Sequence, residues 1–238
     1  MSIIPESVPT GAIRYNTDSN KMECFDGTKW WEVSVRSPDL NGSARGLIAS
    51  GRISSGTPSD VIDYVTISTT GNATDFGNVN QAAESLFNGE CASKVRLIKW
   101  GGYPGTHVNT IEYITFSTLG DAVDFGDMTH TVRGGGSLSN ATRGVAAGGL
   151  NPTHLNNIDY ITIASTGNAT DFGDTGGGAE MQPPVSNSTR GVFGARHSSS
   201  TVMEYITIAS AGNTTDFGTD DAIQSSGGSA SNSHGGLS

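Results

Sequence analysis

A repeated segment is the feature that most constrains the fold of this chain. Residues 158–163 read Ile-Asp-Tyr-Ile-Thr-Ile, and residues 167–173 read Gly-Asn-Ala-Thr-Asp-Phe-Gly. Close copies of both segments occur three more times, and the period of 45 to 49 residues indicates four structural units in succession. The repeat is marked by equivalent tyrosines and phenylalanines, which are Tyr64, Tyr113, Tyr160 and Tyr205, and Phe76, Phe125, Phe172 and Phe217.

Each unit carries the pattern of short β-strands. In residues 158–163 both alternating faces hold apolar side chains, as expected of a strand that packs on two sides. The Gly-Asn-Ala-Thr-Asp segment that follows is typical of a tight turn. A further strand pattern precedes each unit, beginning at Arg45, Val95, Arg143 and Arg190. We therefore predict two clear strands, a short third one around Asp-Phe, and a fourth before the next unit.

Units of about 47 residues with up to four antiparallel strands match the blades of a β-propeller. We predict an all-β fold in which residues 39–238 form a small four-bladed propeller. Residues 231–237 resemble the opening of a fifth unit, and we expect them to complete the first blade and close the ring. Two other architectures fit the repeat: an open array whose ends pair with other subunits, and a trimer in which equivalent units stack into a prism.

Residues 1–38 lie outside the repeat and predict a separate β-meander. Three strand patterns, at 11–16, 21–25 and 29–33, are joined by polar turns, and residues 34–39 form the expected hinge. A sheet this small cannot bury its tryptophans alone, so it should pack on the propeller, on a copy of itself or on another protein. The candidate attachment and oligomerisation residues are Tyr15, Phe25, Trp30 and Trp31.

Two resemblances support this division. Residues 11–18, continuing to Phe25-Asp26-Gly27-Thr28-Lys29-Trp30, resemble a short β module of bacteriophage tail-fibre and other virion proteins. The repeats resemble the kelch-like repeats of structural proteins from tailed phages. The Gly-Gly pair typical of kelch repeats is present at residues 101–102 and 148–149, but it is absent from the first and fourth units. The resemblances imply a virion structural protein, assembled in the host cytoplasm.

Composition excludes several other classes. The chain has a net charge of −10, which disfavours binding to nucleic acid. No apolar run approaches the roughly 18 residues of a membrane helix, and residues 1–11 lack an export signal, so we expect a soluble protein without membrane insertion. Two cysteines, Cys24 and Cys91, are too few for a four-ligand zinc site, and we interpret them as reduced packing residues.

The motifs that could carry chemistry have simpler explanations. Asp-Phe-Gly matches the magnesium-binding motif of protein kinases, but the glycine-rich loop and catalytic loop of a kinase are missing. Asp121, Asp124 and Asp127 lack the spacing of a calcium loop. No nucleophile elbow or distinctive carboxylate pair stands out. We therefore predict no catalytic residue, no metal and no cofactor.

Recognition is expected in the loops that vary between units, because variable loops on a constant frame commonly carry binding. The loop at residues 100–109 is the richest, and its candidate binding residues are Trp100, Tyr103 and His107. They offer a stacking surface for a sugar ring or a protein partner, although Trp100 could instead pack between blades.

The sequence thus favours a non-enzymatic virion protein, displayed as a tail fibre, spike or decoration that binds a host-surface glycan or protein. Its other partners would be virion proteins and further copies of itself. Two alternatives remain at this stage: a purely architectural neck or tail component, and a propeller enzyme that degrades surface glycans.

Overall fold

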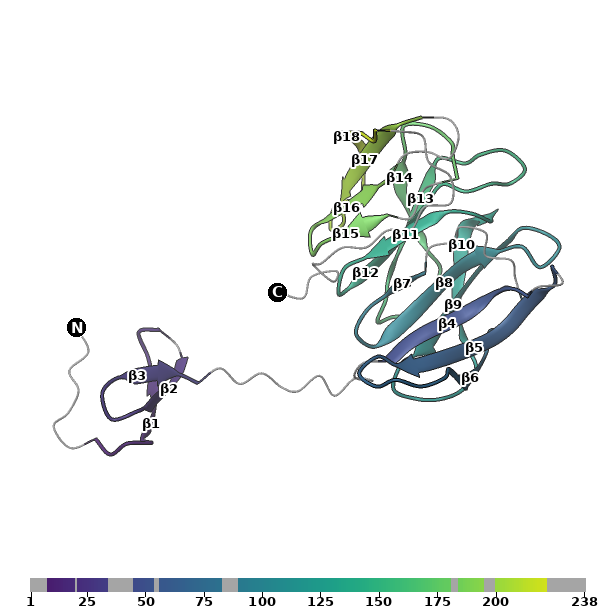
Figure 1. The fold of residues 1–238 in the computed structure, drawn as a ribbon. Helices are drawn as coiled ribbons and strands as arrows, with labels where there is room; N and C mark the ends of the chain where they lie inside the picture. The colour runs from purple at the N-terminus through teal and green to yellow at the C-terminus, as the bar shows by residue number, and fades with distance from the viewer. Residues whose placement is uncertain are drawn as a thin grey trace. The chain divides into compact units, whose positions relative to one another are not determined.

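The computed structural model describes residues 8–19, 21–33, 45–53, 56–82, 90–180, 184–194 and 200–221. Its internal contacts divide the chain into two units, Met1–Leu40 and Asn41–Ser238, where the sequence had suggested a boundary after residue 38. Every regular element in these residues is a β-strand, and the strands form five antiparallel sheets (Figure 1). The all-β prediction is confirmed.

The first unit is a three-stranded meander in the order β1-β2-β3. Its strands are β1 (Ile13–Asn16), β2 (Lys21–Phe25) and β3 (Trp30–Glu32). The turn between β2 and β3 is built on Asp26, whose Oδ1 accepts the backbone N–H groups of Thr28 and Lys29 at 2.8 Å each. These bonds replace strand pairing at the turn and hold the pKa of Asp26 well below its ordinary value.

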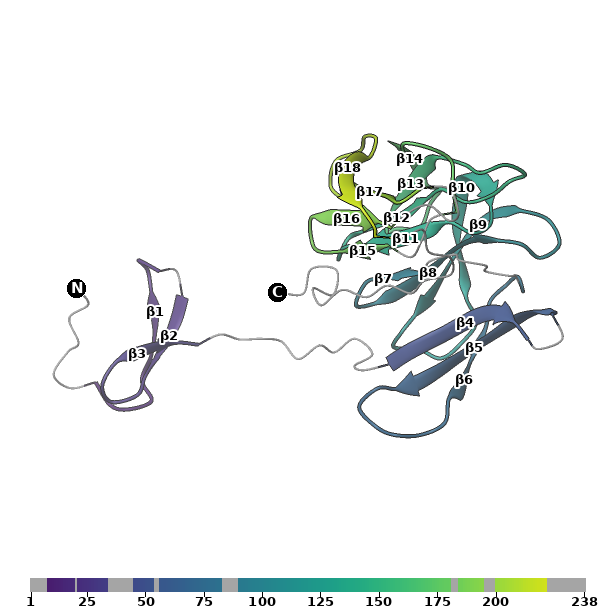
Figure 2. The same cartoon turned by 45° about the horizontal axis from the view of Figure 1, so that its top comes forward.

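In the second unit each repeat forms one sheet, and the strands of each sheet follow in chain order (Figure 2). The strands of the first sheet are β4 (Arg45–Arg52), β5 (Pro58–Thr66) and β6 (Thr74–Asn78). Those of the second are β7 (Cys91–Ala92), β8 (Arg96–Gly102), β9 (Val108–Thr115) and β10 (Val123–Val132). Those of the third are β11 (Gly136–Ser139), β12 (Arg143–Ala147), β13 (Asn157–Thr162) and β14 (Thr170–Asp174). Those of the fourth are β15 (Val185–Ser186), β16 (Arg190–Phe193), β17 (Val202–Thr207) and β18 (Thr215–Thr219).

Strand register corrects one equivalence drawn from the sequence. Arg45, Arg143 and Arg190 pair with the threonines at 66, 162 and 207, and in the second repeat it is Arg96, not Val95, that pairs with Thr115. The sequence pattern had matched Val95 with these arginines, because Arg96 is followed by a leucine. In the other repeats the arginine is followed by a glycine, at Gly46, Gly144 and Gly191. The repeat therefore begins with an arginine in all four units.

Successive sheets of the second unit pack face to face. We call the side of a sheet that carries the repeat tyrosine its tyrosine face. This face packs on the next sheet, against the side that does not carry the tyrosine. At the junction of the second and third sheets, Ile111 and Phe125 meet Ile161 and Ile163, all 3% exposed or less. The other two junctions are built in the same way, with Ile62 and Phe76 on Leu97 and Ile114, and Ile158 and Phe172 on Ile206 and Ile208.

The predicted ring closure stays a prediction. Within the described residues no strand pairing joins the first sheet to the fourth, and residues 231–237, which were expected to close the ring, lie outside the described residues. The expected hinge at residues 34–39 also lies outside them.

Candidate functional site

The repeat tyrosines belong to a stack that is formed in every sheet. The arginine that opens each repeat lies over the tyrosine ring of the same repeat, with 4.2 to 5.0 Å between the guanidinium carbon and the ring centre. Each tyrosine also meets the phenylalanine of its own repeat edge-on, at centroid distances of 5.8 to 6.2 Å. Because all four repeats contain this stack, it is part of the frame and not a binding site.

The same arginines link each sheet to the next. Arg45 donates to the carbonyl oxygen of Phe116 at 2.7 Å, and Arg96 donates to that of Ile163 at 2.8 Å. Arg143 donates to that of Ile208 at 2.8 Å. A charged donor stacked on an aromatic ring and bonded to a carbonyl is a strong, directional contact. Sequence reasoning found these arginines but did not assign them this role.

The three candidate loop residues do not form one surface. Trp100 is 3% exposed and lies in the core between the second and third sheets, where its indole N–H donates to Cys91 Sγ at 3.4 Å. It is therefore not available for stacking on a ligand, which corrects the binding role expected for it and agrees with the alternative that it packs between repeats. Burial raises the pKa of the Cys91 thiol to about 12, and both cysteines are free, as expected of packing residues.

Tyr103 and His107 do come together at the end of the β8–β9 hairpin. Their ring centroids are 5.0 Å apart, and the Arg133 guanidinium lies 4.9 Å from the Tyr103 ring centre. Partial burial, with the nearby charge of Arg133, lowers the pKa of His107. Two half-buried rings beside a guanidinium suit a planar or sugar-like ligand with acceptor groups. Arg133 was missed because it follows β10, far from this loop in sequence.

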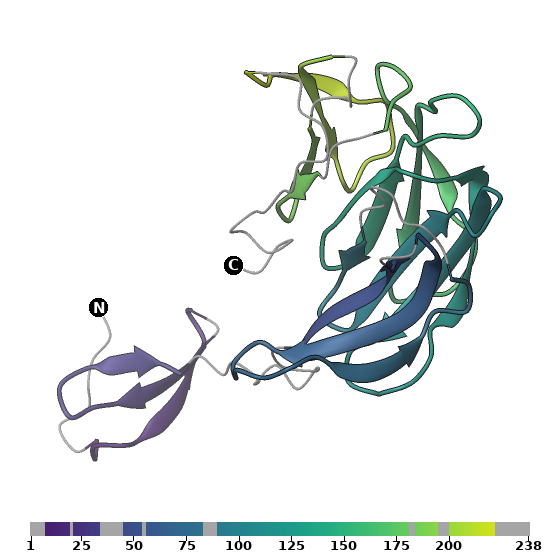
Figure 3. The same ribbon diagram turned by 45° about the vertical axis from the view of Figure 1, so that its right-hand side comes forward.

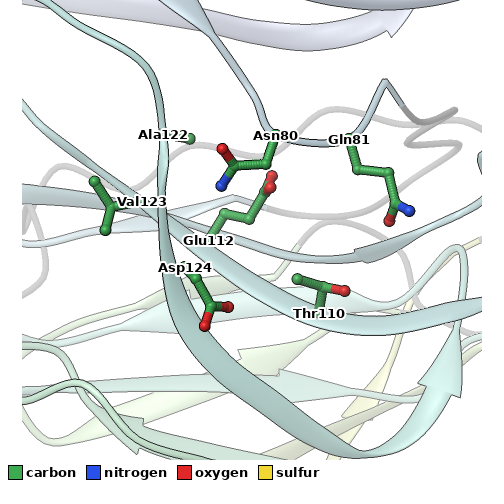
Figure 4. A pocket seen from close by; sticks show the side chains of 7 residues that line it. All are labelled: Asn80, Gln81, Thr110, Glu112, Ala122, Val123 and Asp124. Carbon is green, nitrogen blue, oxygen red and sulfur yellow. The ribbon is translucent and has the colours of Figure 1, made fainter.

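A buried carboxylate borders a cavity between the first two sheets. Glu112 of β9 is 1% exposed and lines a cavity of about 560 Å³ with Asn80, Gln81, Thr110 and Asp124. Figure 4 shows its carboxylate directed toward Asn80. Among the described residues its oxygens receive no hydrogen bond, but Oε2 forms an ion pair with Lys99 Nζ at 3.4 Å.

The equivalent carboxylates of the next two repeats accept hydrogen bonds from the preceding sheet. Asp159 accepts the backbone N–H and the hydroxyl of Thr129, at 2.8 and 2.7 Å. Glu204 accepts the backbone N–H of Gly176 at 2.9 Å. Thr129 and Gly176 lie four residues after the repeat phenylalanine, where the first repeat has Asn80. The cavity thus marks an incomplete copy of a structural contact.

The most distinctive surface of the first unit is an uncovered apolar sheet face. Strand register places Ile13, Cys24 and Trp31 in one cross-strand row, and Tyr15 opposite Met22 in the next. We call this the apolar face; Val33 joins it beside Met22, whose carbonyl oxygen accepts the Val33 N–H at 2.8 Å. Ile13, Tyr15 and Trp31 are 63%, 55% and 54% exposed. Large apolar side chains rarely gather on one exposed face unless something covers it.

The other face of this small sheet is self-sufficient. Glu23 accepts from Arg14 at 2.8 Å and from Asn16 at 2.9 Å, and these bonds lower its pKa. Phe25 is 6% exposed and packs on Trp30, with ring centroids 5.3 Å apart. Of the four candidate attachment residues, Phe25 and Trp30 therefore hold the sheet together, whereas Tyr15 and Trp31 lie on the apolar face.

In the described part of the chain no three His, Cys, Asp or Glu side chains are grouped to hold a metal ion. The same residues include no helix with the length and apolar character needed to span a bilayer. No protein-family model matches the chain, and no curated protein matches it.

Proposed function

We propose that this chain is a non-enzymatic structural protein of a phage virion. The first unit attaches it to other virion proteins, and the repeat unit is displayed as a tail fibre, spike or decoration. The observation that carries the proposal is the apolar face of the β1–β3 sheet, where Ile13, Tyr15, Met22, Trp31 and Val33 are each 38% exposed or more.

The apolar face requires a partner for a simple physical reason. A three-stranded sheet has two faces, and large apolar side chains stay exposed on one of them, so the hydrophobic effect favours burying that face. Burial of apolar area contributes about 25 cal/mol per Å², and five large side chains provide enough for a stable contact. The virion protein beneath the sheet, shared by several copies of this chain, covers this face.

The repeat unit serves as the displayed part. Its four sheets are blades of a kelch-like propeller arrangement, since each is a small antiparallel meander sandwiched against its neighbour. The end of the β8–β9 hairpin presents Tyr103 and His107 beside Arg133, and this cluster binds a host-surface glycan or protein. The neck or tail alternative has the same attachment and lacks only this last contact.

The glycan-degrading alternative has less support. Glu112 and Asp124 are cross-strand neighbours that line a cavity, which is the arrangement expected of a pair of catalytic carboxylates. However, the same pairing recurs as Asp63 with Asp75, Asp159 with Asp171, and Glu204 with Asp216. A pair present in every sheet belongs to the repeat frame.

Two measurements test the proposal. Quantitative mass spectrometry of gradient-purified particles should find the chain at a fixed ratio to the major capsid protein, and its absence would reject the virion assignment. Incubation of the purified protein with host polysaccharides should give binding that weakens in a Tyr103→Ala variant, without release of reducing ends. Release of reducing ends that is lost in Glu112→Gln would favour the enzyme.

A further inference from the structure

The three internal junctions of the repeat unit share one hydrogen-bond pattern. Between the second and third repeats, the carbonyl oxygens of Phe125 and Asp127 accept the N–H groups of Gly167 and Ala169 at 2.7 and 2.8 Å. In return, Asn168 Oδ1 accepts the N–H of Asp127 at 3.1 Å. The pattern recurs with Phe76 and Asn78 on residues 120–122, and with Phe172 and Asp174 on residues 212–214.

The fourth repeat exposes the surface that, in each internal junction, is covered by the following sheet. Phe217 is 47% exposed, whereas its three equivalents are 3% exposed beneath the following sheet. A Cβ atom added at Gly218 would meet nothing within 4 Å. Arg190 lies over Tyr205 as its equivalents do, yet among the described residues its guanidinium has no carbonyl acceptor.

The first repeat begins with the other half. Ile67 is 70% exposed and Ile48 61%, whereas Ile163 and Ile208, the equivalents of Ile67, are 2% and 0% exposed. Residues 71–73 read Gly-Asn-Ala. The same three residue types stand at positions 167–169, where the third repeat forms its hydrogen bonds with the second. The two ends are thus complementary in apolar surface, in backbone donors and acceptors, and in sequence.

Within the described residues, no strand pairing joins the two halves in one chain. Figures 1 and 3 show the first and fourth sheets at opposite ends of the array, with the second and third sheets between them. A second copy can supply the missing half without changing any internal junction. Heterologous contacts of this kind join the tail of one copy to the head of the next.

We infer that the fourth repeat docks on the first repeat of a second copy of this chain, in the register of the internal junctions. Gly71 and Ala73 of one copy donate to the carbonyl oxygens of Phe217 and Thr219 of the other. Arg190 donates to the carbonyl oxygen of Ile67. This inference depends on the repeat junctions alone and is independent of the virion assignment. It is the alternative to closure of the four-bladed ring within one chain.

Amide hydrogen exchange of the full-length protein tests the contact, because Gly71 and Ala73 should become protected only when a second copy binds. Raising the protein concentration should slow exchange in the peptide spanning residues 67–78 by at least about tenfold. The amides of Gly120, Gly167 and Gly212 should stay protected at every concentration and report that the fold is intact. Protection of residues 71–73 that does not depend on concentration would mean that the chain's own residues cover this end, and would overturn the inference.

A pair of single-end variants tests the direction of docking. Phe217→Glu blocks the exposed surface of the fourth repeat, which is the tail, and Ile67→Glu blocks that of the first repeat, which is the head. Both positions are exposed, so neither change should unfold the chain. The peptide spanning residues 67–78 differs in mass between the two variants and can be followed separately. In the mixture, only the peptide with Ile67 should gain protection, since only that chain keeps an intact head. Equal protection of both peptides, or none in either, would contradict head-to-tail docking.

Discussion

Gly126 and Gly167 lie against one another at the junction of the second and third repeats. A Cβ atom added to Gly126 would stand 2.5 Å from the carbonyl carbon of Gly167, and Gly126 has a φ of 144°. Gly218 has nearly the same φ, 139°, but faces open space. The two glycines thus have nearly the same φ, but only Gly126 lies against a neighbouring repeat.

This pair gives a matched test of sheet packing. Both Gly126→Ala and Gly218→Ala introduce backbone strain, but only Gly126→Ala forces the second and third sheets apart. We expect Gly126→Ala to lower the free energy of unfolding by about 1–3 kcal/mol more than Gly218→Ala. Urea unfolding at low protein concentration measures both, and equal losses would contradict the packing described for this junction.

The arginines that open the repeats give a second matched pair of variants. Arg143 donates to the Ile208 carbonyl oxygen and stacks on Tyr160, whereas Arg190 only stacks on Tyr205 among the described residues. Arg143→Met removes a charged hydrogen bond between sheets and should cost about 1.5–3 kcal/mol. Arg190→Met should cost about 1 kcal/mol or less, the value of an exposed cation–π contact. Thermal unfolding of the two variants compares them directly; a larger loss from Arg190→Met is the result that the structure does not allow.

The incomplete contact at Glu112 predicts a stabilising substitution. Thr129 gives Asp159 both its N–H and its hydroxyl, and Asn80 occupies the equivalent position beside Glu112. Asn80→Thr supplies a hydroxyl to the buried carboxylate and should raise the free energy of unfolding by about 1 kcal/mol. Thr129→Val should lower it by about 1–3 kcal/mol, because Asp159 loses its hydroxyl donor. A calorimetric scan in which both variants shift in the same direction would contradict the comparison.

Glu90 predicts a fall in stability with rising pH. Burial raises its pKa from 4.5 to about 7, although the charge of Lys99 opposes the shift. Between these values the folded protein binds the proton more tightly than the unfolded chain, so raising the pH favours unfolding. The stabilisation that comes from proton binding at Glu90 is present at pH 4 and lost by about pH 7. It contributes at most about 3 kcal/mol to the free energy of unfolding. Urea unfolding across this range should show a smaller pH dependence in Glu90→Gln than in the wild-type protein.

The repeat allowed much of the fold to be predicted. The alternating pattern of residues 158–163 and the turn that follows are local features, so the strands of all four units and the separate meander could be read from the sequence. The alignment of Val95 failed because register depends on cross-strand pairing, which places Arg96 opposite Thr115.

The candidate sites were less predictable because they depend on packing between repeats. Trp100 reads as a loop aromatic in the sequence but lies in the core, because Gly144 of the third sheet leaves room for its ring: a Cβ there would lie 3.2 Å from it. Arg133 reaches Tyr103 only through the fold. The sequence does carry a signal for the apolar face, because alternate residues along all three strands are apolar: Ile13, Tyr15, Met22, Cys24, Trp31 and Val33.

The most direct test of the account measures how much of the chain enters purified particles when one face of the β1–β3 sheet is changed. Ile13→Gln combined with Met22→Gln makes the apolar face polar, and Lys21→Gln places the same side chain on the opposite face as a control. We expect the amount of the double variant in particles to fall by about tenfold or more, because the variant loses buried apolar contact with the virion. Lys21→Gln should be incorporated like the wild-type chain. Normal incorporation of the double variant would show that the virion is not held through this face.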